Sequence, residues 1–132
     1  MIGTTLSHFR IESELGAGGM GQVYLAEDTN LHRKVALKVL SKQLAADPKG
    51  QEMLFSEART ASRLTHPNIA TVFEVDLVDG VPFIAMELIE GKSLKDLLET
   101  GAVSNDQLTE IARQAAEGLN EAHGAGILHR DI

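Results

Sequence analysis

Apolar and polar residues alternate along much of the N-terminal part of the chain, which is the spacing of β-strands with one buried face. The pattern predicts strands over residues 9–15, 22–28, 34–40, 69–76 and 82–88. Asp79-Gly80 separates the last two strands and can take the positive φ angles of a tight hairpin turn. We therefore expect a sheet of five antiparallel strands.

A helical spacing interrupts this alternation over residues 51–65. Its apolar residues recur every three or four positions, which places Leu54, Ala58, Ala61 and Leu64 on one stripe. Asp47-Pro48, just upstream, is a suitable helix start. One helix is thus inserted between the third and fourth strands.

Two further helices are predicted after the last strand. Ser93 can cap a short helix that reaches residue 99 and stops at Gly101. Ser104 and Gln107 form a capping box for a longer helix over residues 104–123, which carries an apolar stripe along one face. The predicted fold class is α+β, a five-stranded antiparallel sheet with one inserted helix followed by the first helices of a helical part.

Composition narrows the classes of function. The chain has 132 residues, of which 43% are hydrophobic and 23% charged, and this is the balance of one globular domain. A net charge of -7 argues against a nucleic-acid surface, which needs clustered basic residues. The chain has no cysteine, no signal-peptide pattern in residues 1–5 and no apolar run of membrane-spanning length. We expect a cytoplasmic protein without a membrane segment in this chain.

Three glycines stand at G-x-G-x-x-G spacing between the first two strands: Gly16, Gly18 and Gly21. Glycine lets a hairpin bring main-chain N–H groups against phosphate oxygens without a Cβ in the way. The same spacing fits a plain flexible hairpin or the dinucleotide-binding fingerprint of an NAD-type oxidoreductase. The fingerprint requires a helix directly after the glycines, whereas residues 22–26 alternate like a strand.

Lys38 lies on the third strand, where its neighbours give it a definite face. Ala36 and Lys38 share one face, and residues 35, 37 and 39 share the apolar opposite one. A small residue beside a cation suits a nucleotide, with Ala36 and Val23 over a purine and the lysine on the α and β phosphates. A solvated strand lysine is the alternative interpretation.

Glu57 falls on the stripe of the inserted helix, on a face that we expect to be buried. A buried carboxylate needs a cation, and Lys38 is the strongest candidate on the strands. The alternative is that Glu57 sits at the edge of the stripe in water.

Three segments in this order resemble the protein kinase catalytic domain: residues 16–23 (GAGGMGQV), residues 35–38 (VALK) and residues 129–131 (HRD). The likeness covers residues 9–132 and is strongest to bacterial eukaryotic-like serine/threonine protein kinases. It implies a partial kinase domain over residues 1–132, with an N-lobe at 1–88, a hinge at 87–91 and the start of a helical C-lobe at 92–132.

The resemblance also implies roles for individual residues. Lys38, Glu57 and Asp131 would be catalytic, with Asp131 orienting the substrate hydroxyl and accepting its proton. Met86 would be the gatekeeper, and the main chain of Glu87 and Ile89 would face the adenine edge. The residues expected to contact ATP are Leu15, Gly16, Ala17, Gly18, Gly19, Met20, Gly21, Val23, Ala36, Lys38, Met86, Glu87 and Ile89. The cofactors implied are ATP and Mg²⁺, and the partner is a protein substrate.

The chain ends one residue after Asp131, so the metal-binding Asn and Asp of the family have no counterpart in it. We therefore expect a truncated kinase domain that is inactive alone. The apolar stripe of residues 104–123 would lack its usual partners and would lower solubility. The alternative is a noncatalytic nucleotide-binding or interaction module of kinase-like fold.

Overall fold

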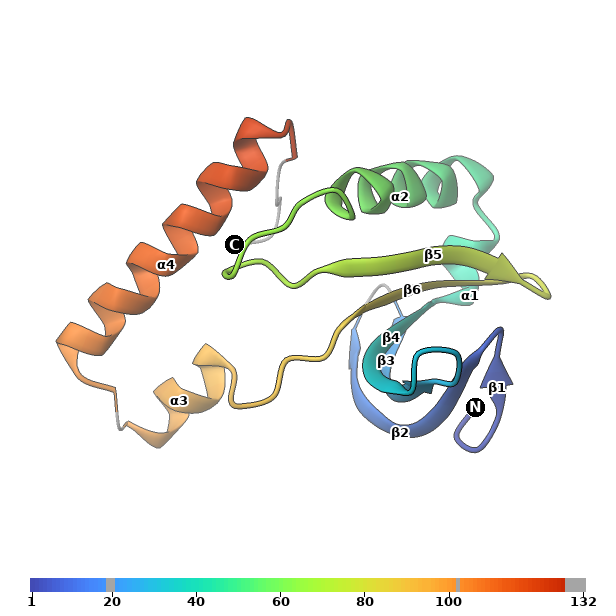
Figure 1. Ribbon diagram of the computed structural model, residues 1–132, viewed down its shortest axis with the longest axis horizontal. Coiled ribbons are helices and arrows are strands. Elements are labelled where there is room, and N and C mark those ends of the chain that lie inside the picture. The colour runs from blue at the N-terminus through green and yellow to red at the C-terminus, as the bar shows by residue number, and fades with distance from the viewer. Residues whose placement is uncertain (19–20, 102, 128–132) are drawn as a thin grey trace.

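A six-stranded antiparallel sheet forms one side of the molecule in the computed structural model, which describes residues 1–18, 21–101 and 103–127 (Figure 1). The strands are β1 (Thr5–Leu6), β2 (Phe9–Gly18), β3 (Gly21–Asp28), β4 (Arg33–Leu40), β5 (Val72–Val78) and β6 (Val81–Glu87). Their spatial order is β1-β2-β3-β4-β6-β5. Asp79 and Gly80 join β5 to β6 with φ angles of 51° and 76°, which confirms the predicted hairpin turn.

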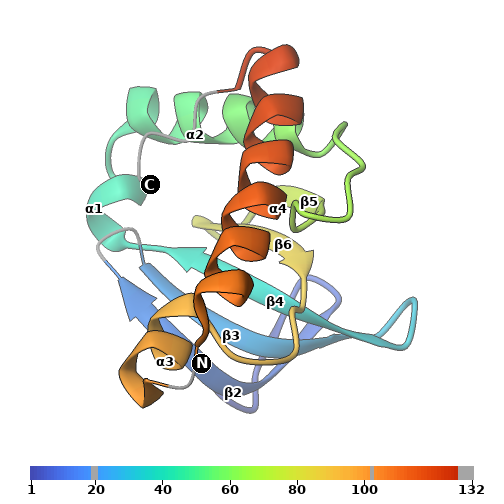
Figure 2. The same ribbon diagram turned by 90° about the vertical axis from the view of Figure 1, so that its left-hand side faces the viewer.

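Four helices accompany the sheet: α1 (Lys42–Ala45), α2 (Pro48–Ala61), α3 (Leu94–Thr100) and α4 (Asn105–Gly124). In Figures 1 and 2, α2 lies over β5, whereas α3 and α4 stand to one side and are reached from β6 through an extended segment. None of the helices among the described residues is long and apolar enough to cross a bilayer.

The helix caps follow the expected chemistry. The Ser93 and Ser104 hydroxyls each accept a hydrogen bond from the main chain at the third position of their helix, and both capping boxes are complete. Asp47 and Pro48 begin α2, and Gly101 ends α3 with a φ of 67°.

The core divides between the two faces of the sheet. One face holds a cluster that includes Phe9, Leu37 and Phe83, and the Phe9 and Phe83 rings meet edge to face at 5.7 Å. The other face is covered by the apolar stripe of α2, where Ala58 packs with Val72 and Ile84. The predicted stripe on this helix is therefore confirmed.

Two elements were not predicted. β1 has only two residues, which pair with β2 as Thr5↔Arg10 and Leu6↔Phe9, so it is too short to show an alternating pattern. α1 is a single turn whose N-terminus is capped by the Ser41 hydroxyl. The sheet thus has six strands rather than the five expected, and two helices rather than one lie between β4 and β5.

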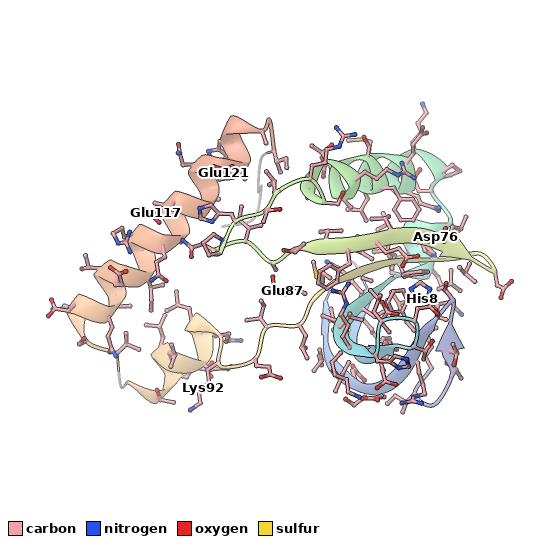
Figure 3. The ribbon with its side chains drawn as sticks, in the orientation of Figure 1. His8, Asp76, Glu87, Lys92, Glu117 and Glu121 are labelled. Carbon is pink, nitrogen blue, oxygen red and sulfur yellow. The ribbon has the colours of Figure 1, made fainter. Side chains whose placement is uncertain are left out.

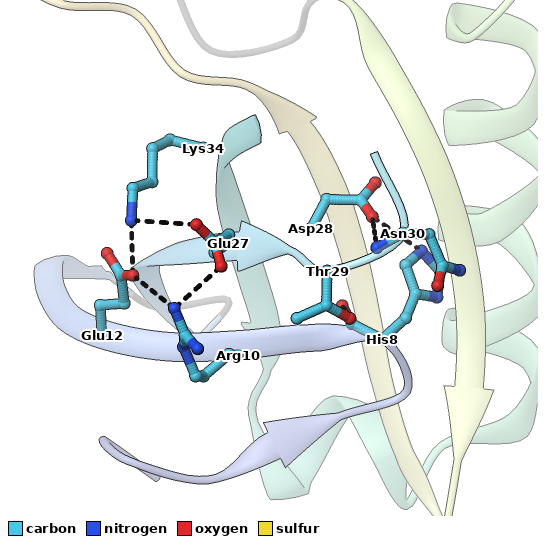
Figure 4. Close-up of polar contacts among 8 residues, drawn as sticks. All are labelled: His8, Arg10, Glu12, Glu27, Asp28, Thr29, Asn30 and Lys34. Atoms are coloured by element: carbon cyan, nitrogen blue, oxygen red, sulfur yellow. Dashed lines mark hydrogen bonds and ion pairs between the residues drawn. The ribbon is translucent and has the colours of Figure 1, made fainter. Parts of the chain in front are cut away.

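Two groups of polar contacts tie the first three long strands together (Figure 4). On the outer surface, Arg10 pairs with Glu27 at 2.8 Å, and Lys34 donates to Glu12, so cations and carboxylates alternate across β2, β3 and β4. The hydrogen bond from Lys34 holds the pKa of Glu12 below its usual value. These charges are exposed, and their contribution to stability is small.

The second group surrounds His8, in the turn between β1 and β2. Its Nε2 lies 3.1 Å from the Glu74 carboxylate and 3.8 Å from that of Asp28. Asp28 is buried, and its carboxylate accepts the main-chain N–H groups of Asn30 and Leu31, which closes the turn into β4 (Figure 4). His8 therefore links the turn between β1 and β2 to β3 and β5.

Candidate nucleotide-binding site

The glycine-rich segment continues the antiparallel pairing of β2 and β3 as far as Gly18 and Gly21. After two register shifts, between Ile11 and Ser13 and between Glu14 and Gly16, the strands pair regularly from Gly16↔Val23 to Gly18↔Gly21. Leu15 and Ala17 are exposed on the same hairpin. Gly19 and Met20, which were expected to complete the ATP contacts, lie outside the described residues. A strand begins at Gly21, so the helix that a dinucleotide-binding fingerprint requires is not formed and the oxidoreductase interpretation is wrong.

The glycines of this hairpin differ in what requires them. Gly21 has a φ of +142°, and a Cβ on it would overlap the Val39 carbonyl oxygen of β4. Gly16 has open space where a Cβ would lie. Gly21 is thus needed by the packing of the sheet, and the main chain at Gly16 is open to a ligand.

One face of the sheet gathers four of the predicted ATP contacts. Val23 of β3 lies opposite Lys38 of β4, and the next row on the same face pairs Ala36 with Met86 of β6. Directly opposed residues of antiparallel strands have Cβ atoms about 5 Å apart. The predicted division of β4 into two faces is confirmed, because its other face, with residues 35, 37 and 39, belongs to the buried core.

Burial on this face suits a ligand that is part apolar and part charged. Ala36 is 8% exposed, whereas Val23, Lys38 and Met86 are half-buried. On the sheet, Lys38 is therefore flanked by small and apolar residues.

The segment after β6 forms the third side of the site. Met86 and Glu87 are the last residues of the strand, Ile89 is 65% exposed, and Gly91 has a φ of +128°. Glu87 also makes two hydrogen bonds with the main chain of Thr71, which sequence reasoning missed. No sequence signal predicts these two bonds, because Thr71 and Glu87 are 16 residues apart and the sequence does not show that they lie side by side.

Glu57 occupies α2, but its burial was predicted wrongly. It is exposed, while Ala58 beside it packs into the core and Leu54 lines the same cluster. Each residue advances an α-helix by about 100°, and the buried residues Phe55 and Ala58 define a covered face from which Glu57 is turned away. The ion pair between Glu57 and Lys38 stays a prediction.

The third kinase-like motif, His129, Arg130 and Asp131, lies outside the described residues. Its position relative to Lys38 therefore stays a prediction as well. Within residues 1–18, 21–101 and 103–127, no group of three or more His, Asp or Glu side chains is arranged to hold a metal ion.

A contact between α4 and the segment before β5 joins the helical part to the sheet. The Asn68 side chain donates to the Gln114 carbonyl at 3.0 Å, and Gly118 is buried against the Asn68 main chain. A largely apolar cavity of about 490 Å³ opens beside this contact, between the end of α2 and α4, and Leu64 and Leu119 are among its lining residues. Along the described part of α4, Leu108, Ile111, Leu119 and Ala122 of the apolar stripe are half-buried, whereas Ala112 and Ala115 are exposed. The stripe is therefore partly covered, and the expected loss of solubility stays a prediction.

The chain is similar to protein kinases over nearly its whole length. The family model for the protein kinase domain matches residues 9–132. A probable serine/threonine-protein kinase of Clostridium acetobutylicum is 42% identical over 134 residues, which cover 100% of this chain and 20% of that protein. The serine/threonine-protein kinase PknD of Mycobacterium tuberculosis is 39% identical over 132 residues, which cover 99% of this chain and 20% of that protein.

Solved structures agree with this likeness. A crystal structure of the Mycobacterium tuberculosis PknI kinase domain superposes with a TM-score of 0.89 at 31% identity, and the match covers 100% of this chain and 54% of that one. The chain thus spans about a fifth of the length of its curated relatives and about half of the solved domain.

Proposed function

Because the chain belongs to the protein kinase domain family, we propose that it forms the ATP-binding part of a serine/threonine protein kinase, which transfers the γ-phosphoryl group of ATP to a hydroxyl group of a protein. The observation that carries the proposal is the shared sheet face of Val23, Ala36, Lys38 and Met86 beside the glycine hairpin. Kinases of this family use ATP with Mg²⁺ in general.

The shape of this face fits an adenine nucleotide. Ala36 lies between Leu25 and Met86 in its cross-strand row, and its side chain is short where a flat ring would lie against the sheet. Val23 supplies apolar contact in the next row. On the hairpin, the open space at Gly16 lets phosphate oxygens approach the main chain.

Lys38 is the residue that we assign to the α and β phosphates. A charge-assisted hydrogen bond is roughly twice as strong as a neutral one, and half-burial among apolar side chains strengthens it further. With a chain charge of -7, such a local cation is required to hold a polyanion.

The remaining roles come from the family. The main-chain carbonyl of Glu87 and the main chain of Ile89 would bind the adenine edge, and Met86 would close the site behind it. Glu57 would hold the Lys38 amine, and Asp131 would orient the protein hydroxyl and take its proton. Bound ATP supplies the phosphoryl group, and these residues hold and orient the reactants.

Titration of ATP into the purified chain tests the proposal. Loss of a charge-assisted hydrogen bond of about 1.5–3 kcal/mol predicts that Lys38→Ala weakens ATP binding roughly 10- to 150-fold. Lys49→Ala is the matched control, since Lys49 is an exposed lysine on α2. Equal ATP affinity in wild type and Lys38→Ala would refute the placement of the phosphates.

The alternative, a noncatalytic module of kinase-like fold, makes a different prediction. In the full-length protein, Lys38→Met and Asp131→Asn should each abolish phosphoryl transfer if the chain serves a kinase. A biological function that persists in both variants would favour the module instead.

A further inference from the structure

The carboxylate of Glu87 takes the place of a main-chain acceptor at the end of β6. The Glu87 N–H donates to the Thr71 carbonyl at 2.8 Å, and the Thr71 N–H donates to the Glu87 Oε2 at 3.0 Å. Figure 3 shows Glu87 where the chain leaves the sheet on its way to α3. Glu87 thus binds both main-chain polar groups of Thr71: its own N–H donates to the Thr71 carbonyl, and its carboxylate accepts from the Thr71 N–H.

A regular antiparallel ladder would use these groups differently. In a closely spaced pair, the two residues exchange both bonds through their main chains, so the Glu87 carbonyl would accept the Thr71 N–H. Among the described residues, the acceptor of that N–H is the carboxylate instead. The Thr71 N–H is therefore satisfied without the Glu87 main-chain carbonyl, which belongs to the last residue of the strand.

We propose that the Glu87 side chain is a positioning residue for adenine recognition: it satisfies the Thr71 N–H so that the Glu87 main-chain carbonyl can accept the 6-amino group of a bound adenine. This inference rests on the proposed function, because it needs the nucleotide at the connector after β6. A carboxylate is the stronger acceptor for the Thr71 N–H, since it carries charge. The carboxylate also holds the connector to the segment that precedes β5, which fixes the direction of the Glu87 carbonyl.

The 6-amino group offers a selective test. ATP has this hydrogen-bond donor on its ring, whereas ITP carries a carbonyl oxygen at the same place and has the same ribose and triphosphate. A positioned carbonyl acceptor favours ATP and disfavours ITP, because two acceptors cannot bond each other. ITP also carries a proton on ring N1, where adenine has an acceptor, so the ratio of the two affinities reports recognition of the whole adenine edge and cancels effects on the phosphates. The change of this ratio between wild type and a Glu87 variant reports the Glu87 carbonyl.

The experiment measures ATP and ITP binding by titration calorimetry in the wild-type chain, Glu87→Ala and Glu87→Gln. We expect wild type to prefer ATP by about tenfold, which is the size of one net hydrogen bond of about 1.4 kcal/mol. Glu87→Ala should lower this ratio clearly below the wild-type value. Glu87→Gln should restore it, because the amide oxygen can still accept the Thr71 N–H.

Controls separate positioning from general damage. Glu90→Ala removes the same charge from an exposed position three residues further along, and should leave the ratio at the wild-type value. Lys38→Ala should weaken both nucleotides alike. If Glu87→Ala fails to fold, Glu87→Asp keeps the charge but shortens the side chain by one methylene, and it should lose the ATP preference in the same way.

The outcomes distinguish the two claims. Wild type that binds neither nucleotide refutes the proposed function together with this inference. Wild type that prefers ATP, with the same preference in Glu87→Ala and Glu87→Asp, refutes the positioning role alone. Amide hydrogen exchange gives a second measurement, since the Thr71 N–H should exchange faster in Glu87→Ala than in Glu87→Gln, and equal exchange would overturn the inference.

Discussion

Replacing Gly21 by alanine should destabilise the sheet, independently of any ligand. Gly21 has a φ of +142°, a region in which residues with a side chain are strained. A Cβ there would overlap the Val39 carbonyl oxygen and would lie 3.0 Å from both the Leu40 Cα and the Ser41 nitrogen. All three atoms belong to main chain, so the contact cannot be relieved by turning a side chain.

The size of the effect follows from these two terms. The strained backbone costs about 1–3 kcal/mol, and forcing apart the packed main chains of β3 and β4 costs about another 1–3 kcal/mol. We expect Gly21→Ala to lower the free energy of unfolding by about 3 kcal/mol. In a chain of this length, that corresponds to a drop in Tm of roughly 10–15 °C.

Thermal unfolding followed by circular dichroism measures this drop, with Gly16→Ala as the control. Gly16 belongs to the same hairpin and has no atom within 4 Å of its Cβ position, so its Tm should change by no more than about 3 °C. A Tm of Gly21→Ala within about 3 °C of wild type would refute the reasoning. If Gly21→Ala lowers the Tm as expected, Gly16→Ala is the better variant for testing phosphate binding, because it changes the hairpin without destabilising the sheet.

Two further predictions concern α4. A Cβ at Gly118 would lie 3.1 Å from the Asn68 carbonyl oxygen, whereas a Cβ at Gly124 would lie in open space and would gain up to about 1 kcal/mol of helix propensity. Gly118→Ala should therefore unfold at a lower temperature than Gly124→Ala. Equal Tm values of the two variants would contradict the packing of Gly118 against Asn68. Hydrogen bonds from Arg113 lower the pKa of Glu110 to about 2, so this pair supports the helix above pH 4.5 and loses its effect as the pH falls toward 2. The ellipticity at 222 nm should decline over that window in wild type and less in Glu110→Gln, and identical profiles would count against the pair.

Local sequence chemistry predicted much of the fold. The Asp79-Gly80 turn and the Ser93 and Ser104 capping boxes depend on residues a few positions apart, so they could be read directly. The face of Ala36 and Lys38 followed from strand alternation alone. Features that arise within a single element were therefore predictable.

Features that depend on the packing of two segments far apart in the sequence could not be predicted. The burial of Glu57 depends on how α2 is rotated over the sheet, and a shift of one position turns a side chain from core to solvent. The sequence gives no reason for a glycine at position 118 of the helix, and the reason is the contact with the Asn68 main chain. The bond between Thr71 and the Glu87 carboxylate likewise depends on the register of β5 and β6, where the pairing shifts between Val72 and Glu74.

The two edge strands of the sheet, β1 and β5, affect whether separate copies of this chain can pair edge to edge in concentrated solution. β1 offers only two residues as a template, and β5 carries Glu74 and Asp76, so a second β5 aligned beside it would bring like charges together. Strand-to-strand growth into fibrils is thus discouraged at both margins. We expect aggregation of the chain to start from the partly covered apolar stripe of α4, and we expect mild detergent to reverse it.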